Sequence, residues 1–171
     1  MLDLMLSRRT VRKFTEEKVS EEDREAIIKA AMSAPSGRAI YPVELVVCED
    51  ARTIAELKNC RSNGTTALNT APLAIAIIAD ADRSDVWDED ASISAAYIML
   101  ECEKLNLGCC WVQIRGRSND QGDSGEAVKK LLRIPDNYEV LSVMAIGHKA
   151  EFPAGYTEDK IDYAKVHRGR F

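Results

Sequence analysis

The run Leu73-Ala-Ile-Ala-Ile-Ile-Ala79 decides the fold more than any other part of the sequence. It is short, uninterrupted and apolar, which is typical of a strand that is buried on both faces. A strand of this kind needs a layer of other elements on each side of its sheet. The run therefore predicts a domain in which helices cover both faces of a central sheet.

Similar patterns lie on either side of this run. Three further apolar stretches are expected strands: Val43–Cys48, Cys109–Ile114 and Glu139–Ile146. Four segments with apolar residues at helical spacing are expected helices: residues 21–34, Ala51–Asn59, Asp90–Leu107 and residues 124–132. Because these strands and helices interleave, we expect an α/β or an α+β sandwich around one sheet.

The ends of the expected helices also carry informative residues. Ser20 precedes three acidic residues, and its hydroxyl is expected to accept a hydrogen bond from a free backbone amide. Ser124 is expected to cap the last helix in the same way. Gly108 follows the longest helical pattern and is predicted to form a left-handed cap at its C-terminal end.

Length and composition limit the class of protein. The 171 residues suit one domain that spans residues 1–171. A content of 46% hydrophobic residues permits a core and argues against disorder. The net charge of −5 argues against a general nucleic-acid binder, which needs a basic surface.

The cellular compartment is also constrained. No apolar run approaches the ~18 residues of a membrane span, and the first residues lack the order of a secretion signal. The five cysteines include no C-x-x-C pair, and a disulfide between the neighbours Cys109 and Cys110 would be strained. We therefore expect a reducing cytoplasm, with the cysteines in the core.

Several common catalytic motifs are absent. The two histidines, His148 and His167, do not lie at metal-ligand spacing. No phosphate loop, dinucleotide-binding glycine fingerprint or nucleophile elbow occurs. A metalloenzyme, a P-loop NTPase and a Rossmann dehydrogenase are therefore poorly supported, and no metal site is expected.

A basic cluster near the start of the chain is the most informative chemical feature. In Ser7-Arg-Arg-Thr-Val-Arg-Lys-Phe14, four cationic side chains fall within six positions of an acidic protein. Arginines present planar donor groups that match a phosphate or a carboxylate. The cluster indicates either a pocket for a phosphorylated ligand or a solvated basic surface.

Three other segments have ordinary interpretations when taken alone. Ala34-Pro-Ser-Gly-Arg38 fits a loop between a helix and a strand. Leu107-Gly-Cys-Cys-Trp-Val-Gln113 fits a core strand with a packed tryptophan, and Gly147-His-Lys-Ala-Glu151 fits a loop after the last strand. Taken together and in this order with the basic cluster, the segments resemble the nitroreductase family of FMN-dependent oxidoreductases.

The resemblance rests on four motifs. R-R-T-V-R-K-F resembles the family's R-R-S-x-R-x-F, and A-P-S-G-R-A-I-Y-P resembles its A-P-S-[AG]-x-N-x-Q-P. L-G-C-C-W-V is similar to L-G-T-C-W-I, and G-H-K-A-E falls at the family's G-[YH]-x-x-E. Three positions depart from the family's usual residues, namely Ala39, Tyr41 and Val43.

The resemblance implies an α+β fold, a three-layer sandwich around a mostly antiparallel sheet. It also implies an interlocked homodimer with FMN at the interface, in which residues 151–171 extend over the partner subunit. Arg8, Arg9, Thr10 and Lys149 would bind the FMN phosphate, and Arg12 would lie near the flavin N1–C2=O edge. Pro35, Ser36 and Gly37 would line the ring from the other subunit. Asn63 would bond its pyrimidine side, and Val112 and Gln113 would approach N5 through main-chain groups.

The implied activity is transfer of electrons from NADH or NADPH to nitroaromatic, quinone or similar acceptors by a ping-pong mechanism. FMN carries this chemistry, so no catalytic side chain is expected. A flavin store or sensor without turnover is an alternative, and a module that binds a phosphorylated partner or nucleic acid through residues 8–13 is another. In the polar loop of residues 115–123, Arg115 or Arg117 either contacts an anionic donor such as NADPH or is simply solvated.

Overall fold

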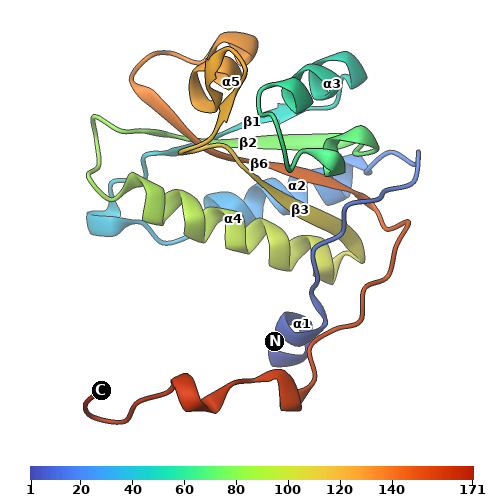
Figure 1. Ribbon diagram of the computed structural model, residues 1–171, viewed down its shortest axis with the longest axis vertical. Helices are drawn as coiled ribbons and strands as arrows, with labels where there is room; N and C mark the ends of the chain where they lie inside the picture. Colours follow the sequence, from blue (N-terminus) through green and yellow to red (C-terminus); the bar gives the residue numbers. More distant parts are fainter.

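The computed structural model describes residues 1–171 and has a four-stranded sheet at its centre (Figure 1). The strand order is β1-β2-β6-β3, and each neighbouring pair is antiparallel. The strands are β1 (Val43–Cys48), β2 (Leu73–Asp80), β3 (Leu107–Gln113) and β6 (Tyr138–His148). The antiparallel pairing settles the choice between α/β and α+β, and all four predicted strands are confirmed.

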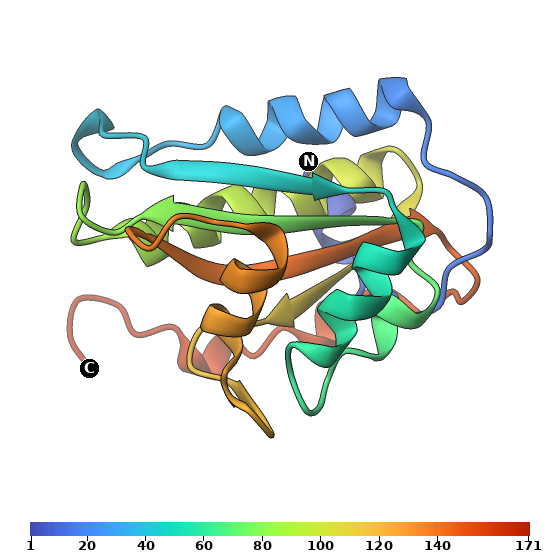
Figure 2. The ribbon, with the colours of Figure 1, turned by 90° about the horizontal axis from the view of Figure 1, so that it is seen from above.

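Helices cover both faces of this sheet, as the buried run 73–79 predicts. Helices α2 (Glu21–Met32) and α4 (Trp87–Lys104) lie on one face, and α3 (Ala51–Asn59) and α5 (Ser124–Leu132) lie on the other (Figures 1 and 2). The side chains of β2 alternate between the two layers: Ile75 and Ile77 contact the α2 and α4 side, and Ala74 and Ala76 face α3 and α5. Both apolar layers are therefore buried, and the result is a three-layer sandwich.

The helix starts follow the expected chemistry, with one correction. The Ser20 hydroxyl accepts a hydrogen bond from the amide of Asp23 (3.1 Å), which confirms the predicted cap of α2. The predicted cap at Ser124 is wrong. Asp123 caps α5 by accepting from the amide of Glu126 (3.1 Å), while the hydroxyl of Ser124 is buried without a partner. An ionised carboxylate at this position also interacts favourably with the helix dipole.

The prediction for Gly108 is wrong as well. Helix α4 ends at Lys104, and the left-handed residue after it is Asn106, with φ of 59°. Gly108 is already the second residue of β3, where its partner across the ladder is Gly147. Asparagine tolerates the left-handed conformation better than most residues, so the turn is complete before the glycine is reached.

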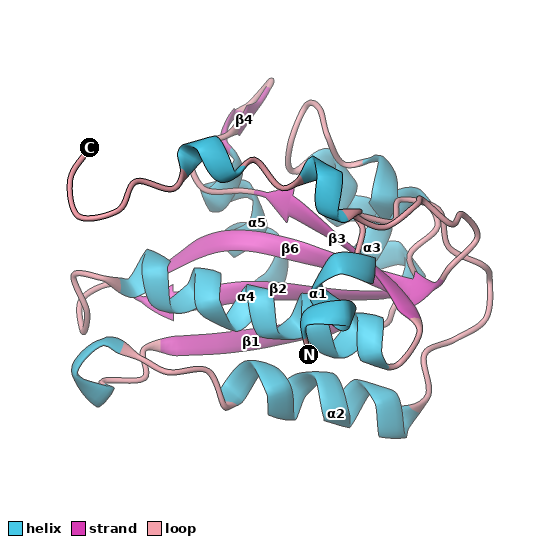
Figure 3. Cartoon of the chain, turned by 90° about the horizontal axis from the view of Figure 1, so that it is seen from below, coloured by secondary structure: helices cyan, strands magenta, loops and turns pink.

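Two terminal segments lie outside the three layers, on the side of α4 (Figures 1 and 3), and the first of them contacts α4. One contains the short helix α1 (Leu2–Ser7). The other is residues 151–171, which are exposed apart from partial burial of Glu151 and Gly155 and contain the 3₁₀ turns Glu158–Lys160 and Tyr163–Lys165. Several short elements are not evident from the sequence pattern: α1, the 3₁₀ turns Gly37–Ala39 and Thr66–Asn69, and the hairpin of β4 (Ser118–Asn119) and β5 (Gly122–Asp123).

Candidate functional site

The basic segment is attached to the sheet by its backbone. The amide of Val11 donates to the carbonyl of Cys109 (3.2 Å), and the amide of Thr15 donates to the carbonyl of His148 (3.0 Å). The carbonyl of Lys13 accepts from the amide of Ala150 (2.9 Å). Residues 8–14 therefore run along the open edge of β3 and across the end of β6.

Two glycines make room for this segment. A Cβ at Gly108 would lie 2.7 Å from Cγ1 of Val11, and one at Gly147 would lie 3.0 Å from Cβ of Phe14 and 2.6 Å from Cδ of Pro72. Val11 and Phe14 are both buried. Because Gly108 and Gly147 have no side chains, the segment of residues 8–14 can pack directly against β3 and β6. This close contact is the structural reason for a glycine at position 108.

The segment leaves two guanidinium groups free. The side chains of Arg8 and Arg12 form no hydrogen bond or ion pair within the chain, and Thr10 keeps its hydroxyl available. The backbone amide of Arg12 donates to Glu151 Oε1 (2.6 Å). Unpaired cations on a rigid backbone in an acidic protein are suited to an anionic ligand.

The other two predicted phosphate ligands are engaged within the chain. Arg9 donates to the carbonyl of Ala154 and lies over the ring of Tyr156, with 5.0 Å between Cζ and the ring centroid. Lys149 Nζ donates to Glu103 Oε2 (2.8 Å), and each of these side chains is 12% exposed. Arg9 therefore holds the C-terminal arm, and Lys149 is neutralised by α4.

Pro35, Ser36 and Gly37 lie elsewhere. Ser36 and Gly37 are hydrogen-bonded to Asp90 at the start of α4, whereas Lys149 is bonded to Glu103 near its end. Asp90 and Glu103 are 13 positions apart on α4, which is roughly 20 Å along the helix axis. Figures 1 and 2 show the two segments at opposite ends of the molecule. A single chain does not bring them together.

The end of β3 supplies the third predicted group. Val112 is fully buried among core side chains, so only its backbone is available to a ligand. The Gln113 side chain is occupied, because its amide oxygen accepts from Trp111 Nε1 (2.8 Å) and its amide nitrogen donates to the carbonyl of Arg115 (2.8 Å). The carbonyls of Cys109 and Gln113 both bond away from β6. By the alternation of a strand, the backbone groups of Trp111 face the same open edge.

Arg61 is a residue that the sequence analysis missed. Its guanidinium donates to the carbonyl of Gln113 (2.9 Å) and lies close to Gly64. The predicted ligand Asn63 is exposed on the same short loop. Arg61 thus fixes the loop of Asn63 against the edge of β3. A lone arginine two residues from a predicted ligand gave no signal that would have identified it.

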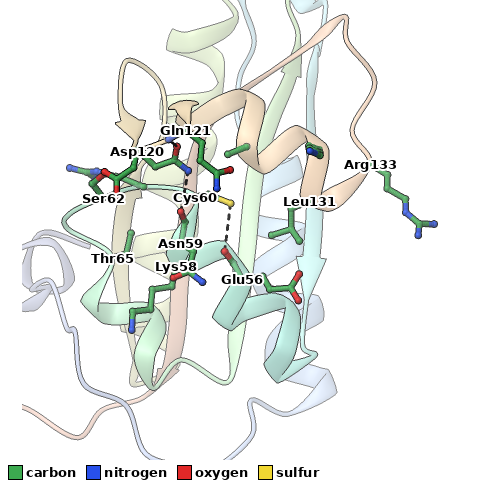
Figure 4. A pocket seen from close by; sticks show the side chains of 14 residues that line it. Glu56, Lys58, Asn59, Cys60, Ser62, Thr65, Asp120, Gln121, Leu131 and Arg133 are labelled. Carbon is green, nitrogen blue, oxygen red and sulfur yellow. Dashed lines mark hydrogen bonds between the residues drawn. The ribbon is translucent and has the colours of Figure 1, made fainter.

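A polar pocket of about 780 Å³ lies between α3 and α5. The loop after α3 and the β4–β5 hairpin close one side of it, where the amide of Ser62 donates to the carbonyl of Ser118 (3.2 Å) and Asn119 donates to the carbonyl of Asn59 (3.2 Å). Figure 4 shows the side chains of Arg133 and Lys58 on different sides of the pocket, with Arg133 pointing away from it. These two cations therefore do not converge on one point.

The two candidate arginines of the 115–123 loop differ. Arg115 pairs with Asp88 (3.0 Å) and lies over the Trp87 ring, with 5.5 Å between Cζ and the centroid. Arg117 is exposed and its side chain has no partner in the chain. Arg115 therefore connects the loop to α4, and only Arg117 is free to meet an anion.

The five cysteines all lie in the core. All five are free thiols and all are buried, as expected. Burial raises the pKa of Cys110 to about 11, although nearby Arg12 opposes this shift. Burial likewise raises the pKa of Cys60 to about 11. These thiols are protonated at neutral pH, so they contribute packing rather than covalent chemistry.

The arrangement matches a known family. The sequence model described as "Nitroreductase family" matches residues 5–62 and 59–148. The chain belongs to the nitroreductase family. No helix in the chain combines the length and the apolar character that crossing a bilayer requires.

Three relatives illustrate the likeness. A solved structure of an FMN-dependent nitroreductase from Clostridium difficile is 38% identical, superimposes with a TM-score of 0.98, and each chain covers 100% of the other. A protein of Archaeoglobus fulgidus named as an NADH dehydrogenase/NAD(P)H nitroreductase is 29% identical over 99% of this chain and 98% of its own. The NADPH-flavin oxidoreductase of Vibrio harveyi is 28% identical over 89% of this chain and 67% of its own.

Proposed function

We propose that this nitroreductase-family protein is an FMN-dependent oxidoreductase that transfers electrons from NADH or NADPH to nitroaromatic, quinone or similar small acceptors. Its relatives carry names that specify FMN, NAD(P)H or flavin. The observation that carries the proposal is the pair of unpaired guanidinium groups, Arg8 and Arg12, beside the Thr10 hydroxyl on the open edge of β3.

These residues fit the chemistry of FMN. A phosphate monoester carries close to two negative charges at neutral pH and has several acceptor oxygens. Arg8 and Thr10 supply donors for it on a backbone that the sheet holds in place. The open backbone edge at Trp111 and the loop of Asn63 both lie along β3. Their polar groups are suited to hydrogen-bond the edge of the flavin ring.

A homodimer would complete the site. Residues 35–37 lie roughly 20 Å along α4 from the Lys149 end, so a second copy has to supply them if they line the same ring. The arm of residues 151–171 extends below the three layers (Figure 1), is almost entirely exposed and is available to cover a partner subunit. Lys149 would bind the phosphate only by changing its partner from Glu103.

The chain's own residues would bind the flavin, orient it and stabilise charge on it. Bound FMN would supply the two-electron chemistry between the reduced nicotinamide and the acceptor. A fixed cation such as Arg12 stabilises negative charge near it and so raises the reduction potential of a flavin at this edge. One exposed ring face would serve donor and acceptor in turn, which gives ping-pong kinetics. The free thiols fit a reducing compartment such as the cytoplasm.

A visible absorption spectrum tests this function. The purified protein should be yellow, and anaerobic NADPH or NADH should bleach the bound flavin before an added quinone restores it. Protein that binds FMN but is not reduced by either donor would be a flavin store. A preparation that neither contains nor takes up FMN would refute the proposal.

A further inference from the structure

A buried carboxylate holds the loop that carries Ser36 and Gly37. Asp90 lies in the first turn of α4 and is 4% exposed. One of its oxygens accepts from the hydroxyl of Ser36 (2.7 Å), and the other accepts from the backbone amide of Gly37 (2.8 Å). Hydrogen bonds to an ionised acceptor are about twice as strong as neutral ones. Asp90 therefore fixes two consecutive loop residues at once.

The same contact determines the conformation of the rest of the loop. Ser36 Oγ also accepts from the amide of Tyr41 (2.9 Å), so one hydroxyl connects Asp90 to the far side of the loop. Arg38, Ala39 and Tyr41 have φ values of 54°, 53° and 51°. Residues with a Cβ rarely adopt this left-handed conformation without support from their surroundings.

Close packing leaves no room for a side chain at Gly37. A Cβ on Gly37 would lie 2.8 Å from Cγ2 of Val86. The ion pair of the loop, Arg38 with Asp85, is largely exposed, with side chains 63% and 76% accessible. An exposed pair of this kind contributes little. Arg83 donates to the carbonyl of Ile40 (2.9 Å) at the far end of the loop. Asp90, by contrast, is the group that holds Ser36 and Gly37.

We propose that Asp90 is a positioning residue, which holds Ser36 and Gly37 in the geometry in which they line the flavin of the partner subunit. This inference rests on the proposed function. A buried charge is a poor means of increasing stability alone, since well-packed apolar residues often stabilise a protein as much or more. Its value lies in specifying one arrangement of its hydrogen-bond partners.

The test compares FMN-loaded wild type with Asp90→Asn, Ser36→Ala and the double variant. The dissociation constant for FMN, the visible spectrum of the bound flavin and the melting temperature are measured for each. Each single variant should raise the dissociation constant roughly tenfold, as expected for loss of a charge-assisted hydrogen bond, and should alter the flavin spectrum. In the double variant the two losses of FMN affinity should be less than additive, because both changes disrupt the hydrogen bond between Ser36 and Asp90.

Asp85→Asn is the matched control, because it removes the exposed ion pair of the same loop; it should leave FMN binding unchanged. If Asp90→Asn does not fold, Asp90→Glu decides the question, because it keeps the charge but displaces the carboxylate from Ser36 and Gly37 by one methylene. Lower melting temperatures with unchanged FMN affinity and spectrum would show a purely structural role and overturn the inference. Wild type that binds no FMN would refute the proposed function as well, whereas normal binding by wild type and variants alike would refute only the inference.

Discussion

Residues 8–14 and residues 35–41 both carry predicted flavin contacts, and they obtain their shape by different means. The first segment is held by main-chain hydrogen bonds to β3 and β6, which leaves Arg8 and Arg12 free. The second is held by a side chain, Asp90, and three of its residues have positive φ. Residues 8–14 thus present free side chains on a regular backbone, whereas residues 35–41 present a particular backbone conformation.

The largest loss of stability and FMN affinity is expected from a substitution where the backbone of residues 8–14 packs against the sheet. In Gly108→Ala, the new Cβ would overlap Val11 and displace residues 8–14. We expect a loss of about 1–3 kcal/mol in the free energy of unfolding. FMN affinity should fall by more than about 100-fold, because Arg8 and Arg12 move together. Denaturant unfolding and FMN titration measure the two effects.

Gly116→Ala is the control for this change. Nothing lies within 4 Å of a Cβ at Gly116, but its φ of +66° disfavours alanine. It should cost about 1–2 kcal/mol of stability and leave FMN affinity intact. Equal losses of FMN affinity in both variants would show that general destabilisation, rather than the position of residues 8–14, controls binding.

A smaller effect is expected from one free guanidinium. Arg8→Ala should raise the FMN dissociation constant about 10- to 100-fold, the value of a charge-assisted contact to phosphate. The melting temperature should hardly change, because Arg8 has no side-chain partner in the chain. Arg9→Ala is the control: it should mainly free the arm at Ala154 and Tyr156, which limited proteolysis detects. A lowered melting temperature in Arg8→Ala with full FMN retention would show that Arg8 is structural.

The smallest effect is expected in the strained loop. Ala39→Gly should raise the free energy of unfolding by about 0.5–1 kcal/mol, because glycine adopts positive φ without a steric penalty. The same substitution at Ala55, an exposed position in α3, should lower it by about 0.5–1 kcal/mol. Urea unfolding distinguishes the two. If both variants lose stability, then the positive φ at residue 39 carries no strain.

Much of the fold could be predicted because its signals are local. The apolar run 73–79, the strand Val43–Cys48 and the helix Ala51–Asn59 were each evident from periodicity, and the structure places them as predicted. The two wrong predictions of helix caps concern places where two nearby residues are both suitable. Asp123 and Ser124 can each cap the start of α5, and Asn106 and Gly108 can each adopt the left-handed conformation after α4. The sequence alone does not show which residue of each pair does so.

The site was less accessible to sequence reasoning. The basic segment and the Pro35–Gly37 loop were found, but the partners Asp90, Glu103 and Arg61 were not, because each lies far along the chain from the residue that it contacts. Asp90 and Glu103 looked like ordinary helix charges. Their partners are set by how α4 lies beside the sheet, and no spacing along the sequence encodes that contact.

By itself, the sequence determined the four strands of the central sheet, the four helices that cover it, the burial of both faces of the sheet and the family. These depend on periodicity, turn chemistry and the order of motifs, which are all properties of neighbouring residues. The tertiary structure alone decided that Arg9 and Lys149 are engaged within the chain while Arg8 and Arg12 are free. It also placed residues 8–14 and 35–37 at opposite ends of α4. The physical reason is that a charge is neutralised by whichever group folding brings within hydrogen-bond distance, and that depends on contacts between distant segments.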